Sequence, residues 1–252
     1  MSDPARDDWD KHWDQYSNSA TANPAQRYRR VLVLSLLGLT GEYGRILDIG
    51  SGQGDFAAEL NASHPCCEVL GIELSRSGVQ QAQRLVARAT FLQRNLLEPV
   101  SETEQHRNWA THAVCSEVLE HLDNPAILLQ NARAYLAAGC RIVVTVPGGP
   151  MSAFDKHIGH RTHYTPESLK LLLEQAGFQV ETSFAAGFPF FNLYRMAVIL
   201  RGRRLIDDVA CGTESDSSGL ARLVMALFGV LFRLNLTRSR FGWQMVAVAR
   251  YI

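Results

Sequence analysis

The chain has 252 residues, 46% of them hydrophobic, and this composition is sufficient to bury one large core. Lysine plus arginine and aspartate plus glutamate both number 25, so the overall charge gives no reason to expect nucleic-acid binding. The arginines are unevenly placed: residues 188–252 contain nine Arg against four acids, which makes this last quarter basic and the remainder acidic.

Three features bear on the cellular compartment. The first eight residues are polar and lack the basic start and apolar run of a signal peptide, so no export is expected. The longest apolar stretch, Leu223 to Phe232, is about half the length needed to cross a bilayer, although it could lie on one. The cysteines form no CxxC pair and no metal-ligand spacing, so reduced thiols in a cytoplasmic protein are expected. These cysteines are Cys66, Cys67, Cys115, Cys140 and Cys211.

Hydrophobic periodicity predicts the elements in chain order. The first 40 residues contain Trp9, Trp13, Tyr16 and Tyr28 and are expected to form helices that cap one face of a sheet. From residue 45 to 187, short β-branched runs alternate with amphipathic segments, which is typical of βαβ units and a mainly parallel sheet. The predicted strands are Arg45–Ile49, Glu68–Ile72, Thr90–Gln93, His112–Ser116, Arg141–Val146 and Gln179–Phe184, with helices between them.

Local signals place the ends of two of these helices. Asn124-Pro125 opens one, with proline in its first turn, and Ala138-Gly139 is expected to close it before the next strand. The second begins with Thr165 as its N-cap and ends at Gly177.

A seventh strand is predicted at Gln244–Ala249, after a long intervening segment, residues 188–242. This segment has two apolar, arginine-rich helical patterns separated by a polar stretch from Cys211 to Gly219. It is predicted to be an insertion, either a lid that completes a pocket or a surface that lies on anionic lipid. The two roles are compatible.

The strongest local motif is Ile46-Leu47-Asp48-Ile49-Gly50-Ser51-Gly52-Gln53-Gly54, a buried strand that runs into alternating glycines and then a helix. Glycines at such a turn let the backbone approach a ligand closely, as in nucleotide-like cofactor sites. A dinucleotide fingerprint needs its third glycine one residue later, where this chain has Asp55. Asp48 would repel a pyrophosphate but suits a cationic sulfonium with an amino-acid tail.

Two further polar residues follow neighbouring strands. Glu73 ends the second strand, 19 residues after Gly54, where an acid can accept hydrogen bonds from two ribose hydroxyls. Asn95 follows the third strand, where its side-chain amide could meet the edge of an adenine.

In their order, Asp48 to Gly54, Glu73, Asn95 and the run from Ser116 to Leu122 resemble the motifs of class I S-adenosylmethionine-dependent methyltransferases. The chain is similar to the group that contains ubiquinone-biosynthesis O-methyltransferases and natural-product methyltransferases. The resemblance implies a single α/β domain with a Rossmann-like, doubly wound, seven-stranded sheet of order 3-2-1-4-5-7-6, the last strand antiparallel.

On this resemblance the cofactor-binding core is formed by residues 45–187 and 243–252, with residues 1–40 as a helical cap and 188–242 as the insertion. S-adenosylmethionine is the implied cofactor and S-adenosylhomocysteine the product. The residues that the resemblance assigns to cofactor binding are Asp48, Gly50, Ser51, Gly52, Gly54, Glu73, Leu74, Asn95, Leu96 and Glu117.

Methyl transfer is a direct displacement, so the protein mainly aligns the reactants and removes an acceptor proton where one must leave. His121 follows the fourth strand and is the first candidate for this base, because imidazole titrates near neutral pH. A purely structural role at the start of a helix is the alternative. A third option is a divalent cation: Glu117, Glu120 and His121 would share one face if they were helical, although no metal is expected.

Three histidines spaced by three follow the fifth strand, in the stretch from Asp155 to Tyr164. In this fold such a loop borders the acceptor pocket. His157 and His160 are therefore candidates for acceptor contact, and part of the stretch could serve only to order the loop. A metal site is the weaker alternative.

Together these features predict methyl transfer to a small molecule, most simply to a hydroxyl of a lipophilic or glycan-linked acceptor. N- or C-methylation, and a catalytically inactive cofactor-binding partner subunit, are the alternatives. The predicted location is cytoplasmic, with peripheral membrane contact through residues 188–242 as an option. No nucleic-acid partner is expected, and the sequence leaves the acceptor and the oligomeric state open.

Overall fold

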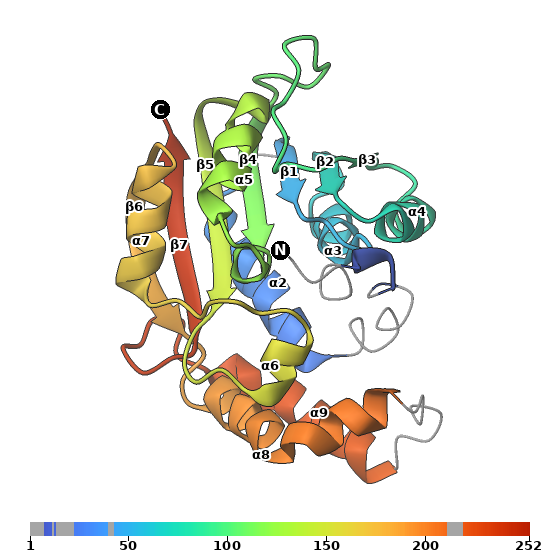
Figure 1. Ribbon diagram of the computed structural model, residues 1–252, viewed down its shortest axis with the longest axis vertical. Coiled ribbons are helices and arrows are strands. Elements are labelled where there is room, and N and C mark those ends of the chain that lie inside the picture. The colour runs from blue at the N-terminus through green and yellow to red at the C-terminus, as the bar shows by residue number, and fades with distance from the viewer. Residues whose placement is uncertain (1–7, 12, 14–22, 40–42, 211–218) are drawn as a thin grey trace.

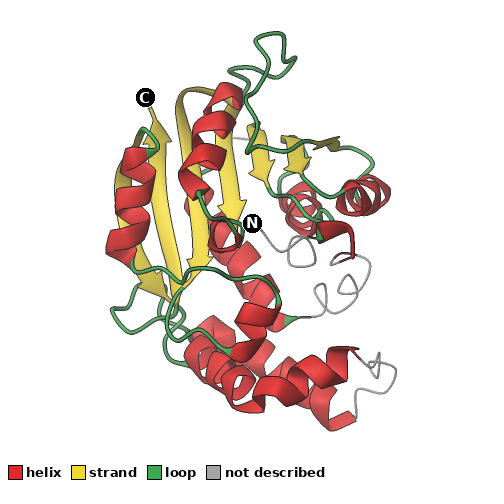
Figure 2. Ribbon diagram, viewed as in Figure 1, coloured by secondary structure: helices red, strands yellow, loops and turns green. Residues whose placement is uncertain are grey.

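A computed structural model describes residues 8–11, 13, 23–39, 43–210 and 219–252, without the side chains of residues 203–210 and 220–222. It contains one seven-stranded sheet with helices on both faces (Figures 1 and 2). Tyr16 of the predicted cap and most of the polar stretch after Cys211 lie outside the described residues. The strands are β1 (Arg45–Ile49), β2 (Glu68–Glu73), β3 (Thr90–Gln93), β4 (Ala110–Ser116), β5 (Leu136–Pro147), β6 (Phe178–Ala186) and β7 (Gln244–Tyr251).

The sheet has the order β3-β2-β1-β4-β5-β7-β6, which confirms the predicted topology. The strands from β3 to β5 are parallel, whereas β7 lies antiparallel between β5 and β6. All seven predicted strands exist, and β1 and β3 have the predicted bounds. The parallel strands read as nearly continuous apolar runs because both of their faces are covered by helices.

Two layers of helices cover the sheet. On one face the core contains side chains from α2, α3 and α4, and on the other it contains side chains from α5 and α7. The helices are α2 (Pro24–Leu37), α3 (Asp55–Ser63), α4 (Arg76–Leu85), α5 (Pro125–Ala132), α6 (Ala153–His157), α7 (Pro166–Gln175), α8 (Phe190–Ala210) and α9 (Gly219–Leu231), with short 3-10 turns η1 (Leu119–His121), η2 (Arg133–Tyr135) and η4 (Phe232–Leu234).

One predicted helix end is wrong. The helix that begins at Pro125 ends at Ala132, and β5 has already begun at Leu136, before Ala138-Gly139. Leu136 pairs with Ala110 of β4, and the register then shifts, so the extra residues form a bulge in which Gly139 adopts a φ of +79°. Gly139 therefore supplies the positive φ that the bulge requires, and it does not cap a helix. The prediction for α7 is confirmed, because the Thr165 hydroxyl accepts a hydrogen bond from the backbone N–H of Ser168 in a capping box.

Helices α8 and α9 lie together at one end of the molecule, beyond the carboxyl ends of β4 and β5 (Figure 1). Helix α8 packs on α6, and α9 packs on α2. Between them lies a small aromatic core in which Phe191 and Phe232 are buried against Tyr28 and Tyr194. In the part of the chain that the structure describes, every helix is too short or too polar to cross a bilayer.

Candidate active site

The glycine turn after β1 is held against the end of β2. Gly50, Gly52 and Gly54 all have positive φ, at +72°, +53° and +87°. The backbone N–H of Gly52 donates to Oε2 of Glu73 at 2.9 Å, and the N–H of Ser75 donates to Oε1 of the same carboxylate at 2.9 Å. The carboxylate of Glu73 is therefore fixed in orientation at the end of β2, with lone pairs left for further donors.

Asp48 lies at the end of β1, beneath the glycine turn. Its side chain is 3% exposed, and Oδ2 has no hydrogen-bond partner among the described residues. Burial, with a smaller contribution from the charge of Glu73, raises the pKa of Asp48 to about 7. An uncompensated buried acid of this kind is stabilised by a nearby cation.

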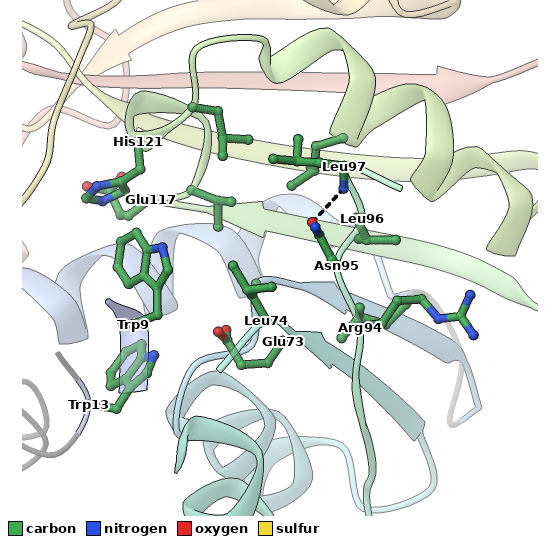
Figure 3. A pocket seen from close by; sticks show the side chains of 15 residues that line it. Trp9, Trp13, Glu73, Leu74, Arg94, Asn95, Leu96, Leu97, Glu117 and His121 are labelled. Atoms are coloured by element: carbon green, nitrogen blue, oxygen red, sulfur yellow. Dashed lines mark hydrogen bonds between the residues drawn. The ribbon is translucent and has the colours of Figure 1, made fainter. Parts of the chain in front are cut away.

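A cleft of about 640 Å³, its open mouth included, lies between the ends of β1, β2 and β4 (Figure 3). Of the residues predicted to bind the cofactor, six line the cleft; the other four, Asp48, Ser51, Gly52 and Gly54, form the turn and the strand end beside it. His121 lines the cleft as well, whereas His157 and His160 do not. The six lining residues are Gly50, Glu73, Leu74, Asn95, Leu96 and Glu117.

Two tryptophans of the N-terminal segment also line the cleft, a role that the sequence analysis missed. Asp10 holds this segment in place, since its Oδ1 accepts hydrogen bonds from the Ser75 hydroxyl at 2.6 Å and the Ser77 backbone N–H at 2.9 Å. The ring of Trp13 lies so close to Gly52 that a Cβ on this glycine would come within 2.5 Å of Cζ2. Trp9 lies with its ring edge-on to His121. The spacing of four residues between these tryptophans, on a helix, is the signal that could have placed them on one face.

Asn95 lines the cleft next to β3, as Figure 3 shows. Its Oδ1 accepts a hydrogen bond from the backbone N–H of Leu97 at 3.0 Å, and its Nδ2 donates to Glu98 at 3.2 Å. The amide thus orders its own loop. Leu74 and Leu96 add apolar surface on the same side of the cleft.

Glu117, directly after β4, joins the cleft to helix α2. Its φ of +58° is unusual for a residue other than glycine and turns the chain sharply into η1. The carboxylate forms an ion pair with Arg29 of α2, with Nε and Oε2 3.0 Å apart, and accepts a hydrogen bond from Gln244 of β7 at 2.8 Å. Neither Arg29 nor Gln244 was singled out in the sequence.

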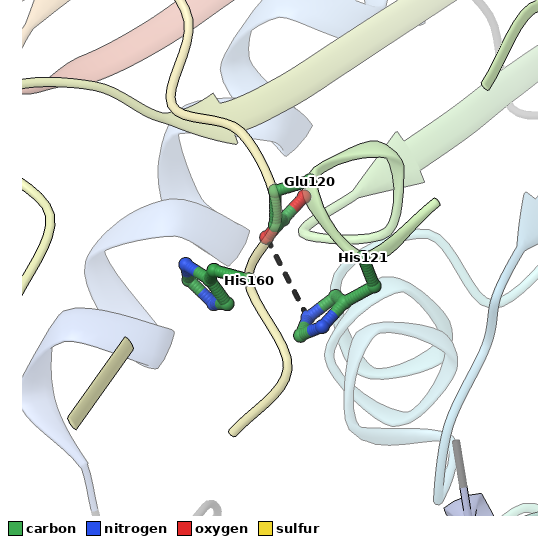
Figure 4. A group of neighbouring side chains, drawn as sticks. All are labelled: Glu120, His121 and His160. Carbon is green, nitrogen blue, oxygen red and sulfur yellow. Dashed lines mark ion pairs between the residues drawn. The ribbon is translucent and has the colours of Figure 1, made fainter. Parts of the chain in front are cut away.

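The proposed trio of Glu117, Glu120 and His121 does not come together around one point, because Leu119–His121 is a single 3-10 turn and Glu117 turns away toward Arg29. His160 takes its place: ligand atoms of Glu120, His121 and His160 lie within 4.8 Å of one another (Figure 4). The rings of the two histidines are edge-to-face, with centroids 4.7 Å apart. This cluster has the donor atoms that a divalent cation uses.

Glu120 is fully buried in this cluster. Its carboxylate oxygens have no hydrogen-bond partner among the described residues, and Oε1 lies 3.9 Å from Nε2 of His121. Burial, and then the charge of Glu117, raise its pKa well above the ordinary value, and Arg29 and Arg195 act in the opposite direction. Two guanidinium groups therefore already place positive charge near this carboxyl.

A second buried network lies behind His160. Asp155 of α6 accepts two hydrogen bonds from the guanidinium of Arg195 on α8, at 2.9 and 3.0 Å. Burial acts to raise the pKa of Asp155, but Arg195 holds it below its ordinary value. His157, at the end of the same helix, is exposed and lies in neither buried cluster.

The hydrogen bonds of this network define the tautomers of two histidines. Nδ1 of His163 lies 3.0 Å from the carbonyl oxygen of Gly149, which can only accept, so this nitrogen carries the proton. Nε2 of His163 then accepts from Nδ1 of His160 at 3.2 Å. Burial lowers the pKa of His160 to about 3 and also lowers that of His163, so both rings are neutral. His160 is thereby left with its unprotonated nitrogen at Nε2.

Comparison with known proteins agrees with this geometry. A family model described as a methyltransferase domain matches residues 22–183. An uncharacterized 37.1 kDa protein in transposon TN4556 of Streptomyces fradiae is 30% identical over 129 residues, which are 51% of this chain and 36% of that protein. The chain thus matches little more than a third of the length of this relative.

Solved structures share the fold at low sequence identity. Phosphoethanolamine N-methyltransferase 2 of Haemonchus contortus, in complex with S-adenosyl-L-methionine, is 17% identical, with a TM-score of 0.57 over 88% of this chain and 52% of that chain. Geranyl diphosphate C-methyltransferase from Streptomyces coelicolor A3(2), with Mg²⁺, geranyl diphosphate and S-adenosyl-L-homocysteine, is 14% identical, with a TM-score of 0.57 over 90% and 78%. The cyclase SpnF is 19% identical, with a TM-score of 0.58 over 88% and 79%.

Proposed function

The chain belongs to the methyltransferase domain family, and from this premise we propose that it transfers the methyl group of S-adenosylmethionine to a hydroxyl of a small-molecule acceptor. The observation that carries the proposal is the carboxylate of Glu73, held by the N–H groups of Gly52 and Ser75 at the edge of the cleft. An acid fixed in this way after the second strand suits the two hydroxyls of a ribose.

The residues present fit this cofactor in charge as well as in shape. Asp48 offers a buried carboxylate with an unsatisfied oxygen, which favours a cationic ligand over a pyrophosphate. Leu74 and Leu96 offer apolar contact, and Asn95 lies where an adenine edge could accept or donate hydrogen bonds. When bound, the cofactor supplies an activated methyl carbon on a sulfonium.

His121 is the proposed base. It lies at the edge of the cleft beside Trp9, so it can take the acceptor's proton as the new C–O bond forms and the C–S bond breaks, leaving a methyl ether and neutral S-adenosylhomocysteine. His160 is proposed to orient His121, because the rings of the two residues are edge-to-face. The tautomer of His160 is in turn defined by its hydrogen bond to His163. Exposed His157 remains a candidate for contact with the acceptor only.

We propose no metal requirement for this reaction. The cluster of Glu120, His121 and His160 has suitable donor atoms, but the positive charges of Arg29 and Arg195 act on Glu120 and would oppose a cation there. Asp155 in the neighbouring cluster is already neutralised by its two hydrogen bonds to Arg195.

Two other acceptor atoms are alternatives to the hydroxyl oxygen. The N-methyltransferase and the C-methyltransferase among the similar structures keep nitrogen and carbon acceptors as alternatives. The similarity to a cyclase keeps a cofactor-binding protein without methyl transfer as another. We also propose a cytoplasmic location, which is supported by the free thiols of Cys66, Cys67, Cys115 and Cys140.

Calorimetric titration with S-adenosylmethionine and S-adenosylhomocysteine tests the cofactor. We expect Glu73→Gln to weaken binding by about 1 to 3 kcal/mol, because it removes a charged acceptor of hydrogen bonds. Glu167→Gln, at an exposed position on α7, is the matched control and should bind normally. Absence of binding by the unmodified chain would contradict the proposal; binding without turnover on hydroxyl, amine and carbon acceptors would favour the non-catalytic alternative.

A further inference from the structure

Helix α9 exposes one apolar stripe along its whole described length. Leu223, Leu227, Val230 and Leu234 follow one another at intervals of four, three and four residues, which places them on one helical face that continues into η4. They are between 55% and 66% exposed. Single exposed leucines are common on protein surfaces, but a complete apolar face of a helix is not.

Helix α8 has a second stripe. Leu193, Met196 and Leu200 are spaced by three and four residues and are exposed, Leu200 to 79%. Leu236 and Phe241, on the segment that follows η4, are exposed as well. We call these two stripes and the segment from Leu234 to Phe241 the outer face of α8 and α9.

The opposite sides of both helices are already packed against the domain. Phe232, which follows α9, contacts Tyr28 of α2, and Arg195 of α8 bonds to Asp155 of α6. None of the described residues between 188 and 242 lines the cofactor cleft. The stripes are therefore not the inner wall of a lid over that cleft, and they need another partner.

The charge around the outer face is positive. Arg233, Arg238 and Arg240 are exposed, and none of them forms an ion pair with an acid in the part of the chain that the structure describes. The acids of residues 188–242 all lie between positions 207 and 216. Two copies of this face would bring like charges together, whereas an anionic surface would complement them.

We propose that the outer face of α8 and α9 binds the surface of an anionic phospholipid bilayer. The apolar stripes enter the boundary between headgroups and acyl chains, and the arginines contact lipid phosphates. Helix α8 also carries Arg195, which bonds to Asp155 behind His160, so the bound surface is connected to the candidate active site. If the proposed function holds, the acceptor is then an amphiphile drawn from the bilayer.

Vesicle co-sedimentation of the full chain tests the proposal. We expect binding to vesicles of phosphatidylglycerol and phosphatidylcholine, and at least tenfold weaker binding to phosphatidylcholine alone. Leu227→Glu should weaken binding to the anionic vesicles at least tenfold, since it places a negative charge, which the anionic lipid repels, in the apolar stripe. Leu171→Glu is the matched control, because Leu171 on α7 is similarly exposed but distant in the fold, and it should bind as the unmodified chain does.

Arg233→Gln and Arg240→Gln provide a second test that leaves the apolar stripe intact. Each should weaken binding to anionic vesicles roughly fivefold, and the binding should decrease as salt is raised. S-adenosylmethionine titration of every variant separates loss of bilayer binding from loss of folding or of the cofactor site. Failure of the unmodified chain to bind anionic vesicles would overturn the proposal, as would unchanged binding by Leu227→Glu. A dimer in light scattering that Leu227→Glu dissociates, without vesicle binding, would assign the face to a second copy of the chain.

Discussion

Arg29 on α2 and Glu117 after β4 form an ion pair, with 3.0 Å between the guanidinium Nε and the carboxylate Oε2. Both side chains are less than one-sixth exposed, at 12% and 15%. Gln244 of β7 joins them: its Oε1 accepts from Arg29 at 3.0 Å and its Nε2 donates to Glu117 at 2.8 Å. Three segments far apart in the sequence are thus connected through Glu117, which lines the candidate active site.

Arg29→Met is expected to lower the free energy of unfolding by about 3 kcal/mol, because it leaves the Glu117 carboxylate buried without its counterion. Arg30→Met is the matched control: Arg30 pairs with Glu59 nearer the surface, and its loss should cost about 1 kcal/mol or less. Urea unfolding followed by circular dichroism measures both. Adding Glu117→Gln to Arg29→Met should recover part of the loss, and equal effects of the two single variants would argue against the role of this pair.

Cofactor affinity should increase as the pH rises from 6 to 8. The pKa of Asp48 is about 7, so in the free protein its carboxyl holds a proton below this pH, and a cationic ligand favours the deprotonated form. Calorimetry of S-adenosylmethionine in buffers of different ionisation enthalpy should detect proton release near pH 6.5. Asp48→Asn should bind more weakly and lose this pH dependence; a pH dependence that survives the substitution would place its origin elsewhere.

His121→Ala should slow turnover by roughly a hundredfold or more while changing cofactor affinity little, if His121 is the base. The readouts are kcat on an identified acceptor and the dissociation constant of S-adenosylhomocysteine. His64→Ala, at a half-buried position after α3 and outside the cleft, is the control and should have the rate of the unmodified chain. A normal rate for His121→Ala would leave this residue with a structural role.

Acid should destabilise the protein through His160. Its pKa is about 3 in the folded chain against an ordinary value of 6.5, so between these values the unfolded chain binds a proton that the folded chain does not. The stability that the neutral ring contributes is complete above pH 6.5 and is lost as the pH falls toward 3. Unfolding free energies of His160→Gln should therefore depend less steeply on pH between 6.5 and 4 than those of the unmodified chain. If the unfolding free energies of His160→Gln and of the unmodified chain had the same pH dependence, His160 would not be the source of the acid sensitivity.

Cofactor binding should change the tryptophan fluorescence, because Trp9 and Trp13 line the cleft. The Trp9→Phe and Trp13→Phe variants should each lose part of the change during titration with S-adenosylhomocysteine. Trp109→Phe and Trp243→Phe, which replace tryptophans outside the cleft, should retain it. A full response in the double variant Trp9→Phe/Trp13→Phe would show that the N-terminal segment does not report on the cofactor.

The sequence by itself determined the sheet and half of the site. Strand periodicity predicted the seven strands, and the glycine turn with Glu73 predicted where the cleft lies, because these features are local to one strand and its following turn. The order of the strands was implied by the resemblance that the motifs carry. The helix end predicted at Ala138-Gly139 was wrong for a local reason too, since a glycine with positive φ can either end a helix or occupy a β-bulge.

Only the tertiary structure decided which charged and aromatic side chains meet. Arg29 and Gln244 reach Glu117 from opposite ends of the chain, and His160 replaces Glu117 beside Glu120 and His121 because a positive φ turns the chain after β4. Trp9 and Trp13 enter the cleft because Asp10 bonds to the start of α4. Such partners are brought together by packing between distant elements. Periodicity along one element can place two side chains on one face, as with Trp9 and Trp13, but it does not identify what that face contacts.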